Sequence, residues 1–268
     1  MSVNMCDANG NLTRVDCLPP EWQGAGYHNS IFRGKYLGSS VAQAQWDAIA
    51  DGSFTDLYVG DYWTINSINW RIAACDYFLH KGDTECTTHH IVIVPDKALL
   101  GANGSSSTYY MSTTNVTTGG YKGSGFHSGT NPAGTVNNTK SICISVINNA
   151  FGSGHILTHR ERLTDTVTSG KPTNTVWEDC DVEYMSEVMA FGHNIWASAP
   201  GYESMTELTQ FPLFALRPDL IYSNTNWWLR DIYNETTFSS IYYTNFATAT
   251  AAGNNWFNCR PYFALKAV

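Results

Sequence analysis

The spacing of hydrophobic and polar residues changes several times along the chain, and each change predicts a different element. Apolar positions repeat with a helical period over residues 39–51, 139–150 and 177–191. A glycine follows each of these stretches, which is a common way for a helix to end. Serine residues stand at the start of the first stretch and can cap it. We therefore expect three modest helices.

Strand patterns appear between the first two helices. Residues 57–65 and 68–73 alternate on either side of the polar pair Asn66-Ser67, which predicts a β-hairpin with a two-residue turn. The run HHIVIVP at 89–95 is almost wholly apolar and predicts a strand that is buried on both faces.

Other segments have weaker patterns. Residues 101–138 consist mainly of Gly, Ser, Thr and Asn, so we expect a long surface loop or an irregular insertion. Residues 155–163 begin like a strand and continue as charged turn residues. Residues 1–30 hold few periodic apolar positions and are expected to form an N-terminal arm or attachment segment.

The order of these elements indicates the fold class. Short strands do not alternate regularly with helices, and no repeat is visible, so a Rossmann or barrel fold is a poor match. The pattern predicts an α+β domain.

Composition narrows the class of protein further. Hydrophobic residues make up 43% of the chain and aromatic residues 13%, which favours a packed core. The net charge is -8 and the 15 Lys and Arg residues are scattered, so we expect no nucleic-acid partner. No apolar run reaches about 18 residues, so no membrane insertion is expected. No secretory signal is visible, and synthesis in a host cytoplasm is expected.

The cysteine pattern does not resemble a disulfide framework. There are seven cysteines, an odd number, and none lies in a Cys-x-x-Cys pair. We expect most of them to be buried thiols that pack as small hydrophobic side chains. Cys6 and Cys17 flank a short polar loop, and a bridge between them is the alternative.

One stretch has the spacing of metal ligands. Cys86 and His89 are three residues apart, and His80 or Asp83 could supply a further ligand. Because His89 and His90 open a predicted strand, their side chains should point to opposite faces. We therefore expect no metal site.

Catalytic signatures are also weak. His155 and His159 are four residues apart, but Ile156 replaces the Glu that a metalloprotease needs. Four carboxylates near the third predicted helix are expected on its solvated side, opposite Trp177: Asp179, Asp181, Glu183 and Glu187. No nucleophile elbow, phosphate loop or dinucleotide fingerprint occurs. We expect no enzymatic activity, no catalytic residue and no cofactor.

The end of the chain has an unusual composition. Two apolar strands, at 227–231 and 259–266, bracket residues 232–258, which we call the cassette. The cassette contains Asn, Thr, Ser, Ala and many aromatic residues, one Glu, and no Lys or Arg. Exposed aromatic rings supply contact area at low entropic cost, so this composition is typical of a binding surface. The alternative is an ordinary surface with a few buried aromatics. Within the first strand, Trp228 should be core and Arg230 should pair with a carboxylate or cap carbonyls.

Four motifs carry a family resemblance: GDYWTINSINWRIAACDYF, GDTECTTHHIVIVPD, FPLFALRPDLI and WWLRD…CRPYFALK. They resemble phage and prophage proteins with a C-type-lectin-like fold, and within that group the variable proteins of diversity-generating retroelements. The resemblance covers residues 31–268, with a variable region at about 227–264, and leaves 1–30 as the arm. It implies short antiparallel strands, two or three helices and long irregular loops.

The resemblance also assigns roles to residues. The positions that match the scaffold are Trp227, Trp228, Leu229, Arg230, Arg260, Pro261 and Phe263. The positions expected to face a ligand are Tyr233, Asn234, Thr236, Tyr242, Tyr243, Asn245, Phe246, Asn255, Trp256 and Asn258. Two departures from the family stand out. The arm is shorter than the N-terminal trimerising domains of the best-known tropism determinant. In the cassette and the strand before it, only Asp231 and Glu235 could serve as calcium ligands, so calcium-dependent sugar binding is not expected.

The function that the resemblance implies is receptor binding. The protein would lie on the surface of a phage particle, contact other virion proteins, and bind a bacterial surface protein or glycan. A homotrimer is the candidate assembly, although residues 1–30 show no heptads. One alternative is a structural decoration or fibre protein of the virion. Another is a glycan hydrolase, which needs two carboxyl groups about 5–10 Å apart in a concave site.

Overall fold

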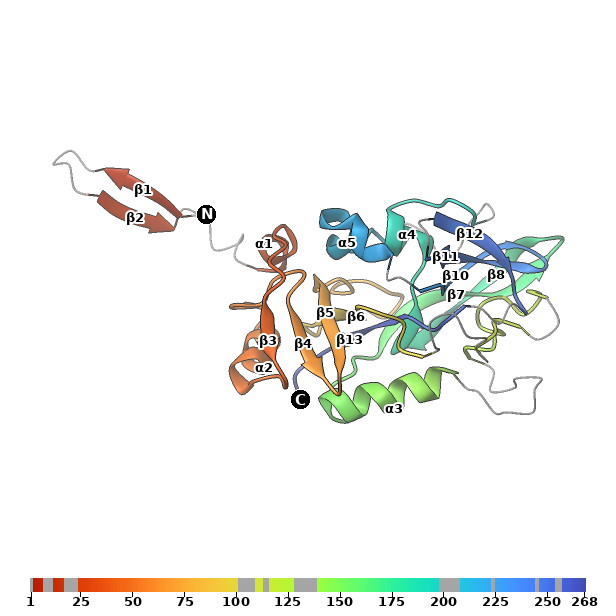
Figure 1. The fold of residues 1–268 in the computed structure, drawn as a ribbon, viewed down its shortest axis with the longest axis horizontal. Coiled ribbons are helices and arrows are strands. Elements are labelled where there is room, and N and C mark those ends of the chain that lie inside the picture. The colour runs from red at the N-terminus through yellow and green to blue at the C-terminus, as the bar shows by residue number, and fades with distance from the viewer. Residues whose placement is uncertain are drawn as a thin grey trace.

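The computed structural model describes residues 2–6, 12–16, 24–100, 109–112, 116–127, 139–197, 208–222, 225–243, 246–253 and 257–268. A six-stranded sheet runs through the body with the strand order β3-β4-β5-β6-β13-β9 (Figure 1). Its strands are β3 (Tyr36–Gly38), β4 (Tyr62–Ile65), β5 (Ile68–Cys75), β6 (Ile91–Pro95), β13 (Pro261–Leu265) and β9 (Val182–Tyr184). Neighbouring strands are antiparallel except for β3 and β4. The last strand of the chain therefore lies inside the sheet, between β6 and β9.

The β4–β5 hairpin confirms the predicted turn. Asn66 and Ser67 have φ values of 53° and 63°, which is the left-handed pair that a tight hairpin turn requires. Ile65 pairs with Ile68 across the turn, and Trp63 pairs with Trp70. Both tryptophans are fully buried, so the hairpin is fixed by its turn and by its core side chains together.

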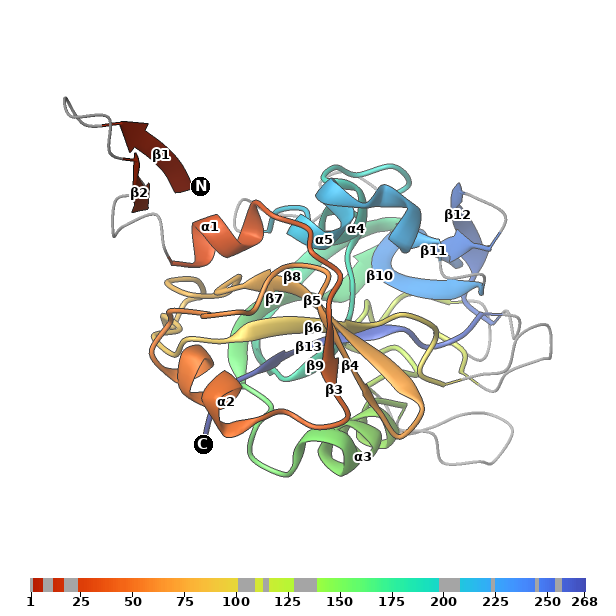
Figure 2. The ribbon, with the colours of Figure 1, turned by 60° about the vertical axis from the view of Figure 1, so that its left-hand side comes forward.

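Strand β6 is buried on both faces, as its apolar run predicts. Ile91 and Ile93 belong to one hydrophobic cluster, whereas Val92 and Val94 belong to another. This division follows from the alternation of side chains along a strand. Figure 2 shows α2 (Gln43–Ala50) and α3 (Thr139–Phe151) on one side of the sheet, and α4 (Glu187–Phe191) and α5 (Pro212–Leu216) on the other.

The first two predicted helices are confirmed. Helix α3 buries Thr139, Cys143, Ile147 and Phe151, which are four residues apart and so form one face. Helix α2 begins at Gln43, later than predicted. The side chain of Gln45 accepts a hydrogen bond from the Ala42 N–H at 2.9 Å, which fixes this later start.

The third predicted helix, 177–191, is wrong. This stretch forms the end of β8 (Lys171–Cys180), β9 and the short helix α4. Strand β8 pairs with β7 (His159–Thr168) in a long hairpin whose turn residues Ser169 and Gly170 have φ values of 50° and 73°. The pair is rich in Thr and Val, which favour strands. The charged residues expected in a turn after 155 lie within β7 instead.

The cassette forms a second sheet. Strands β10 (Trp227–Asn234), β11 (Thr237–Tyr242) and β12 (Phe246–Ala251) are antiparallel, in that order. A 3-10 turn, Pro218–Ile221, follows α5 and leads into this region. The overall class is therefore α+β, as predicted.

The N-terminal residues form a hairpin of β1 (Ser2–Cys6) and β2 (Leu12–Asp16), drawn away from the body in Figure 1. Helix α1 (Ala25–Asn29) packs on the body, however. The Asn29 side chain exchanges hydrogen bonds with the Cys75 backbone at 2.9 and 2.7 Å, and His28 is buried. The body therefore begins at about Gly24, before the predicted boundary at residue 30.

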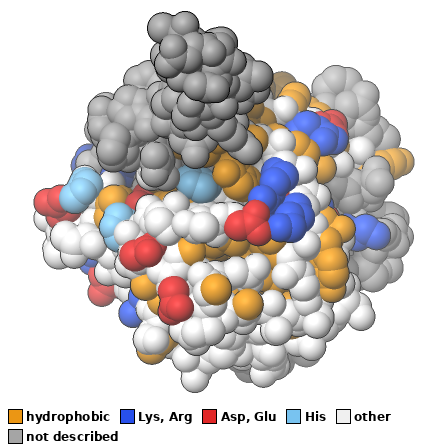
Figure 3. Space-filling model, turned by 90° about the vertical axis from the view of Figure 1, so that its left-hand side faces the viewer, with side chains coloured by type: hydrophobic (Ala, Val, Ile, Leu, Met, Phe, Trp, Pro, Cys, Tyr) orange, Lys and Arg blue, Asp and Glu red, His pale blue; other side chains and the backbone are white. Residues whose placement is uncertain are grey.

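The end of the body near β3 is rich in ion pairs (Figure 3). Arg33 donates to both carboxylate oxygens of the buried Asp61, at 3.0 Å from Nε, and Lys35 contacts Asp56 at 2.7 Å. Tyr36 is an exposed aromatic side chain at this end.

Residues 101–138 are only partly described, at 109–112 and 116–127. Met111, Tyr121 and Phe126 in these segments are buried in the main hydrophobic cluster. The expectation of a surface loop is therefore wrong for these residues, because their apolar side chains fill the core beside Tyr184.

Five cysteines are buried free thiols, as predicted: Cys75, Cys86, Cys143, Cys180 and Cys259. The Cys6 side chain and Cys17 lie outside the described residues, so the bridge between them stays a prediction. Within the described residues, no helix combines the length and apolar character needed to cross a membrane.

Candidate ligand-binding surface

The scaffold positions of the cassette region are all buried. Trp227, Trp228, Leu229 and Arg230 open β10, and Arg260, Pro261 and Phe263 lead into and lie in β13. The indole of Trp228 also donates to the Tyr109 carbonyl at 2.9 Å. These residues therefore form a buried frame.

Arg230 pairs with a buried carboxylate, as expected. Its guanidinium contacts Glu161 on β7 at 2.8 Å, and Glu161 also accepts hydrogen bonds from Tyr262 and from His159, the latter at 2.9 Å. Burial alone would raise the pKa of Glu161, but Arg230, His159 and Tyr262 together hold it well below its usual range. The carboxylate is therefore ionised and links β7, β10 and β13.

Arg260 is held in a different way. Its guanidinium donates to the carbonyls of Pro95 at 2.9 Å, Ile221 at 2.9 Å and Leu220 at 3.1 Å, and lies over the Trp227 ring at 5.1 Å. Burial lowers the pKa of Arg260 to about 10. This side chain fastens the start of β13 to the 3-10 turn.

The structure exposes several of the predicted ligand-facing residues. Tyr233, Tyr242 and Tyr243 are 40%, 42% and 50% exposed. Thr236 is exposed and Asn234 is half-buried. The side chains of four others lie outside the described residues: Asn245, Phe246, Asn255 and Trp256.

Asn258 contradicts the prediction, because it is only 2% exposed. Its N–H donates to the Asn226 carbonyl at 2.9 Å, and its own carbonyl accepts from the Trp228 N–H at 3.2 Å. Asn258 therefore belongs to the frame and does not face a ligand. Its residue type suggested exposure to a ligand, but its backbone hydrogen bonds place it in the frame.

Two of the three exposed tyrosines of the cassette lie side by side. Tyr242 and Tyr243 have ring centroids 5.1 Å apart, at the end of β11. The pairing of Trp227 with Ile241 places this end beside the start of β10, whereas Tyr233 lies near the end of β10.

Tyr233 packs against an aromatic residue that the sequence reasoning missed. Trp196, in the loop after α4, is 38% exposed and meets Tyr233 edge-on with ring centroids 5.5 Å apart. Its indole N–H donates to the Ala247 carbonyl of β12 at 2.9 Å. Ile195 beside it is also exposed. The aromatic surface therefore extends beyond the cassette.

A buried carboxylate holds this loop in place. Glu187 in the first turn of α4 accepts hydrogen bonds from the N–H groups of Ile195 at 2.6 Å, Trp196 at 3.0 Å and Ala197 at 3.0 Å. Its own N–H donates to the buried Asp231 at 2.6 Å. The expectation that Glu187 is solvated is therefore wrong, because its oxygens are used to fix the backbone that presents Trp196.

Glu183, also expected on a solvated helix face, is fully buried as well. It accepts from Tyr121 at 2.9 Å and pairs with Lys140 at 2.7 Å and His127 at 3.0 Å. These cations lower the pKa of Glu183 to about 2 against the opposing effect of burial. Asp181 shares Lys140 at 2.7 Å. An ionised carboxylate cannot serve as the general acid of a glycosidase.

The candidate metal ligands do not converge. His89 contacts Asp76 at 2.7 Å, while the buried His90 lies against the Thr88 carbonyl and accepts from the Phe78 N–H at 3.0 Å. Burial lowers the pKa of His90 to about 4, so its ring is neutral. Across the described part of the chain, no group of three or more His, Cys, Asp or Glu could hold a metal.

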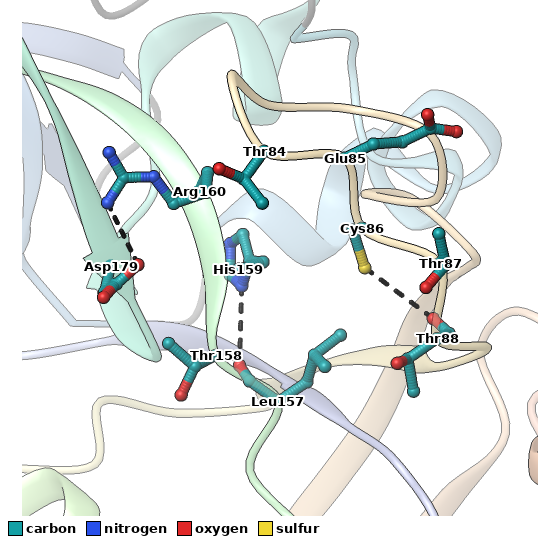
Figure 4. A pocket seen from close by; sticks show the side chains of 10 residues that line it. All are labelled: Thr84, Glu85, Cys86, Thr87, Thr88, Leu157, Thr158, His159, Arg160 and Asp179. Atoms are coloured by element: carbon teal, nitrogen blue, oxygen red, sulfur yellow. Dashed lines mark hydrogen bonds and ion pairs between the residues drawn. The ribbon is translucent and has the colours of Figure 1, made fainter.

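A pocket of about 330 Å³ lies between β7 and the loop before β6 (Figure 4). It is lined by Thr84, Glu85, Cys86, Thr87, Thr88, Leu157, Thr158, His159, Arg160 and Asp179. Arg160 is paired with Asp83 at 2.7 Å and Asp179 at 3.0 Å. Burial raises the pKa of Cys86, so the thiol stays protonated and supplies no activated nucleophile. His155, the other histidine of the predicted pair, contacts the Lys266 carbonyl at 2.9 Å and stacks on Trp46.

Protein-family models, curated proteins and solved structures gave no match to this chain. The site is therefore interpreted from its own residues: a buried frame that carries exposed aromatic side chains on β10, β11 and the loop after α4.

Proposed function

We propose that the chain is a receptor-binding protein of a phage particle, which presents the cassette sheet and Trp196 to a molecule on the bacterial surface. The fold proposed with it is C-type-lectin-like. The ligand would be a surface protein or glycan, and the remaining contacts would be to other virion proteins.

This proposal rests on the contrast between buried and exposed side chains in β10 to β12 and in the loop after α4. The frame residues are buried and hydrogen-bonded, while Tyr233, Tyr242, Tyr243 and Trp196 remain partly exposed. Tyrosine and tryptophan are the side chains most often responsible for binding energy at interfaces. Folded proteins usually bury such rings, so four partly exposed ones next to a rigid frame favour a binding role.

The near absence of charged residues in the cassette favours recognition through uncharged groups. The cassette has Glu235 as its one charged residue and carries no Lys or Arg. Contacts would therefore come from aromatic rings and from the hydrogen-bonding groups of Asn and Thr. Weak binding at each site would be strengthened by several copies on one particle.

A cell-binding experiment tests the proposal. Fluorescently labelled protein is titrated onto a panel of bacterial strains that includes one bound by the wild type. Tyr243→Ala and Trp256→Ala should abolish binding and leave Tm nearly unchanged. Tyr36→Ala removes an equally exposed aromatic ring at the β3 end and serves as the matched control. Normal binding by both cassette variants would refute the assignment.

A structural virion role is the alternative, with the β1–β2 hairpin as the essential contact. In that case, deletion of residues 1–23 should release the protein from particles while cassette variants assemble normally and infect normally. Receptor binding predicts the opposite result for infection: cassette variants assemble but fail to adsorb. Imaging of labelled particles would show whether the protein lies on the capsid or the tail.

A further inference from the structure

Two buried thiols meet in the core between α3 and the end of the cassette. Cys143 lies on the inward face of α3, and Cys259 lies two residues before β13. Their sulfur atoms are 3.3 Å apart, and both residues are fully buried. Among the five cysteines whose side chains the structure describes, these two are in direct contact.

The surrounding backbone holds both residues in place. The Leu99 N–H donates to the Cys259 carbonyl at 2.7 Å, and the Cys259 N–H donates to the Leu100 carbonyl at 3.0 Å. Cys143 is one turn from both Thr139 and Ile147, which are buried on the same helix face. Because neither residue is in a loose loop, the two thiols stay opposite one another.

We propose that Cys143 and Cys259 are the site of an intramolecular disulfide, formed when the chain folds under oxidising conditions. Formation of the bond brings the sulfurs from 3.3 Å to about 2.05 Å. The bond would join α3 covalently to the strand that completes the central sheet. This site is independent of the ligand-binding proposal.

The chemistry needs a small-molecule disulfide, such as oxidised glutathione. One protein thiolate attacks it, releases one glutathione and forms a mixed disulfide. The second protein thiol loses its proton and displaces the second glutathione. The protein gains one S–S bond and loses two hydrogens, while the reagent's S–S bond is reduced to two thiols.

Burial controls when this reaction occurs. Burial raises the pKa of the Cys143 thiol well above its usual value, and the thiolate is the reacting form. Oxidation of the folded protein is therefore slow, and oxidation during folding is fast. Once formed, the bond is equally shielded from reductants.

The bond would act on the unfolded chain more than on the binding surface. It closes a loop of 116 residues that contains β7 to β12. Cross-links across long loops stabilise a fold by restricting the unfolded ensemble. A disulfide in the core would raise the melting temperature, while the exposed side chains of the cassette keep their positions.

Oxidative refolding tests the site. The full chain is refolded from denaturant either with mixed oxidised and reduced glutathione or with excess dithiothreitol, then alkylated under denaturing conditions. The oxidised sample should lose two hydrogens, show a linked Cys143–Cys259 peptide after proteolysis, and have a Tm about 5–15 °C higher. Cys180→Ser, another buried cysteine, should keep all three results.

Single variants complete the test. Cys143→Ser and Cys143→Ala should refold without the linked peptide and lose the Tm difference between oxidising and reducing conditions. The proposal is overturned if oxidised wild type is alkylated at both Cys143 and Cys259, or if the linked peptide joins either of them to another cysteine. It is also overturned if the Tm gain persists in the Cys143 variants.

Discussion

The two halves of strand β10 differ sharply in their surroundings. Trp227 to Ile232 are all buried, whereas Tyr233 is exposed and Asn234 is half-buried. The first half lies between the two hydrophobic clusters, and its pairing with β11 is irregular between Trp228 and Ile232. At this irregularity the Arg230 N–H donates to the Met185 carbonyl at 3.0 Å, away from β11. One strand therefore serves the fold at its start and the surface at its end.

The boundary between frame and surface follows the neighbours of each residue more than its type. Asn258 and Asn234 are the same residue type in the same cassette, yet the first is buried and the second is half-exposed.

The largest effect is expected at Trp228. Truncation to Ala removes a fully buried indole and its hydrogen bond to Tyr109, so Trp228→Ala should lower the free energy of unfolding by about 3–5 kcal/mol. Urea unfolding monitored by circular dichroism measures this loss, with Tyr243→Ala, which truncates an exposed side chain, as the control. A loss below about 1 kcal/mol would show that the buried half of β10 is not a frame.

A loss of similar size is expected when the buried ion pair is broken. Glu161→Gln leaves the guanidinium of Arg230 without its counter-charge in the core, which should cost about 3–5 kcal/mol. The same urea series measures it. Asp219→Asn, which breaks an exposed pair with Arg217, should change stability by less than about 1 kcal/mol. Equal effects of the two variants would contradict the role given to Glu161.

The third prediction concerns acid. The pKa of Glu183 is lowered to about 2 by Lys140 and His127, so its carboxylate binds a proton more readily in the unfolded chain, whose usual value is 4.5. The stabilisation is fully present above about pH 5 and is lost as the pH falls towards 2, by up to about 3 kcal/mol. Urea midpoints between pH 7 and pH 3 should show this, with a shallower slope for Glu183→Gln. A parallel slope for the variant would exclude Glu183 as the cause.

Of the four changes, Trp196→Ala is expected to have the smallest effect on stability, and it should have a large effect on binding. Because the ring is partly exposed, Trp196→Ala should cost little more than about 1 kcal/mol in stability, mainly through its bond to Ala247. On cells that bind the wild type, the same variant should weaken binding at least about tenfold. Unchanged binding would restrict the surface to the cassette itself.

Local patterns in the sequence predicted the local elements well. The Asn66-Ser67 turn, the apolar run of β6 and the helical spacing of α3 each depend on neighbours within a few residues. The helix predicted at 177–191 was wrong because the helical spacing of Trp177, Tyr184 and Val188 is a coincidence. The start of this stretch belongs to strand β8, which pairs with β7.

The buried polar contacts and the exposed surface were harder to predict, because the partners of these residues are distant in the chain. Tyr121 and Glu183 are 62 residues apart, and Trp196 meets β12 across 51 residues. A carboxylate that binds three backbone N–H groups, as Glu187 does, has no short-range signature. The serine before Glu187, which accepts from the Met189 N–H and caps α4, was the one local signal of a helix start there.

The position of β13 has a consequence for how the protein is made. The ribosome completes the cassette before it reaches β13, and until that strand emerges β6 and β9 lack the partner that lies between them. A copy interrupted by a stop codon anywhere in the cassette would leave the central sheet open and its apolar faces in water. A chain that ends within the cassette therefore loses the pairing of β13 with both β6 and β9.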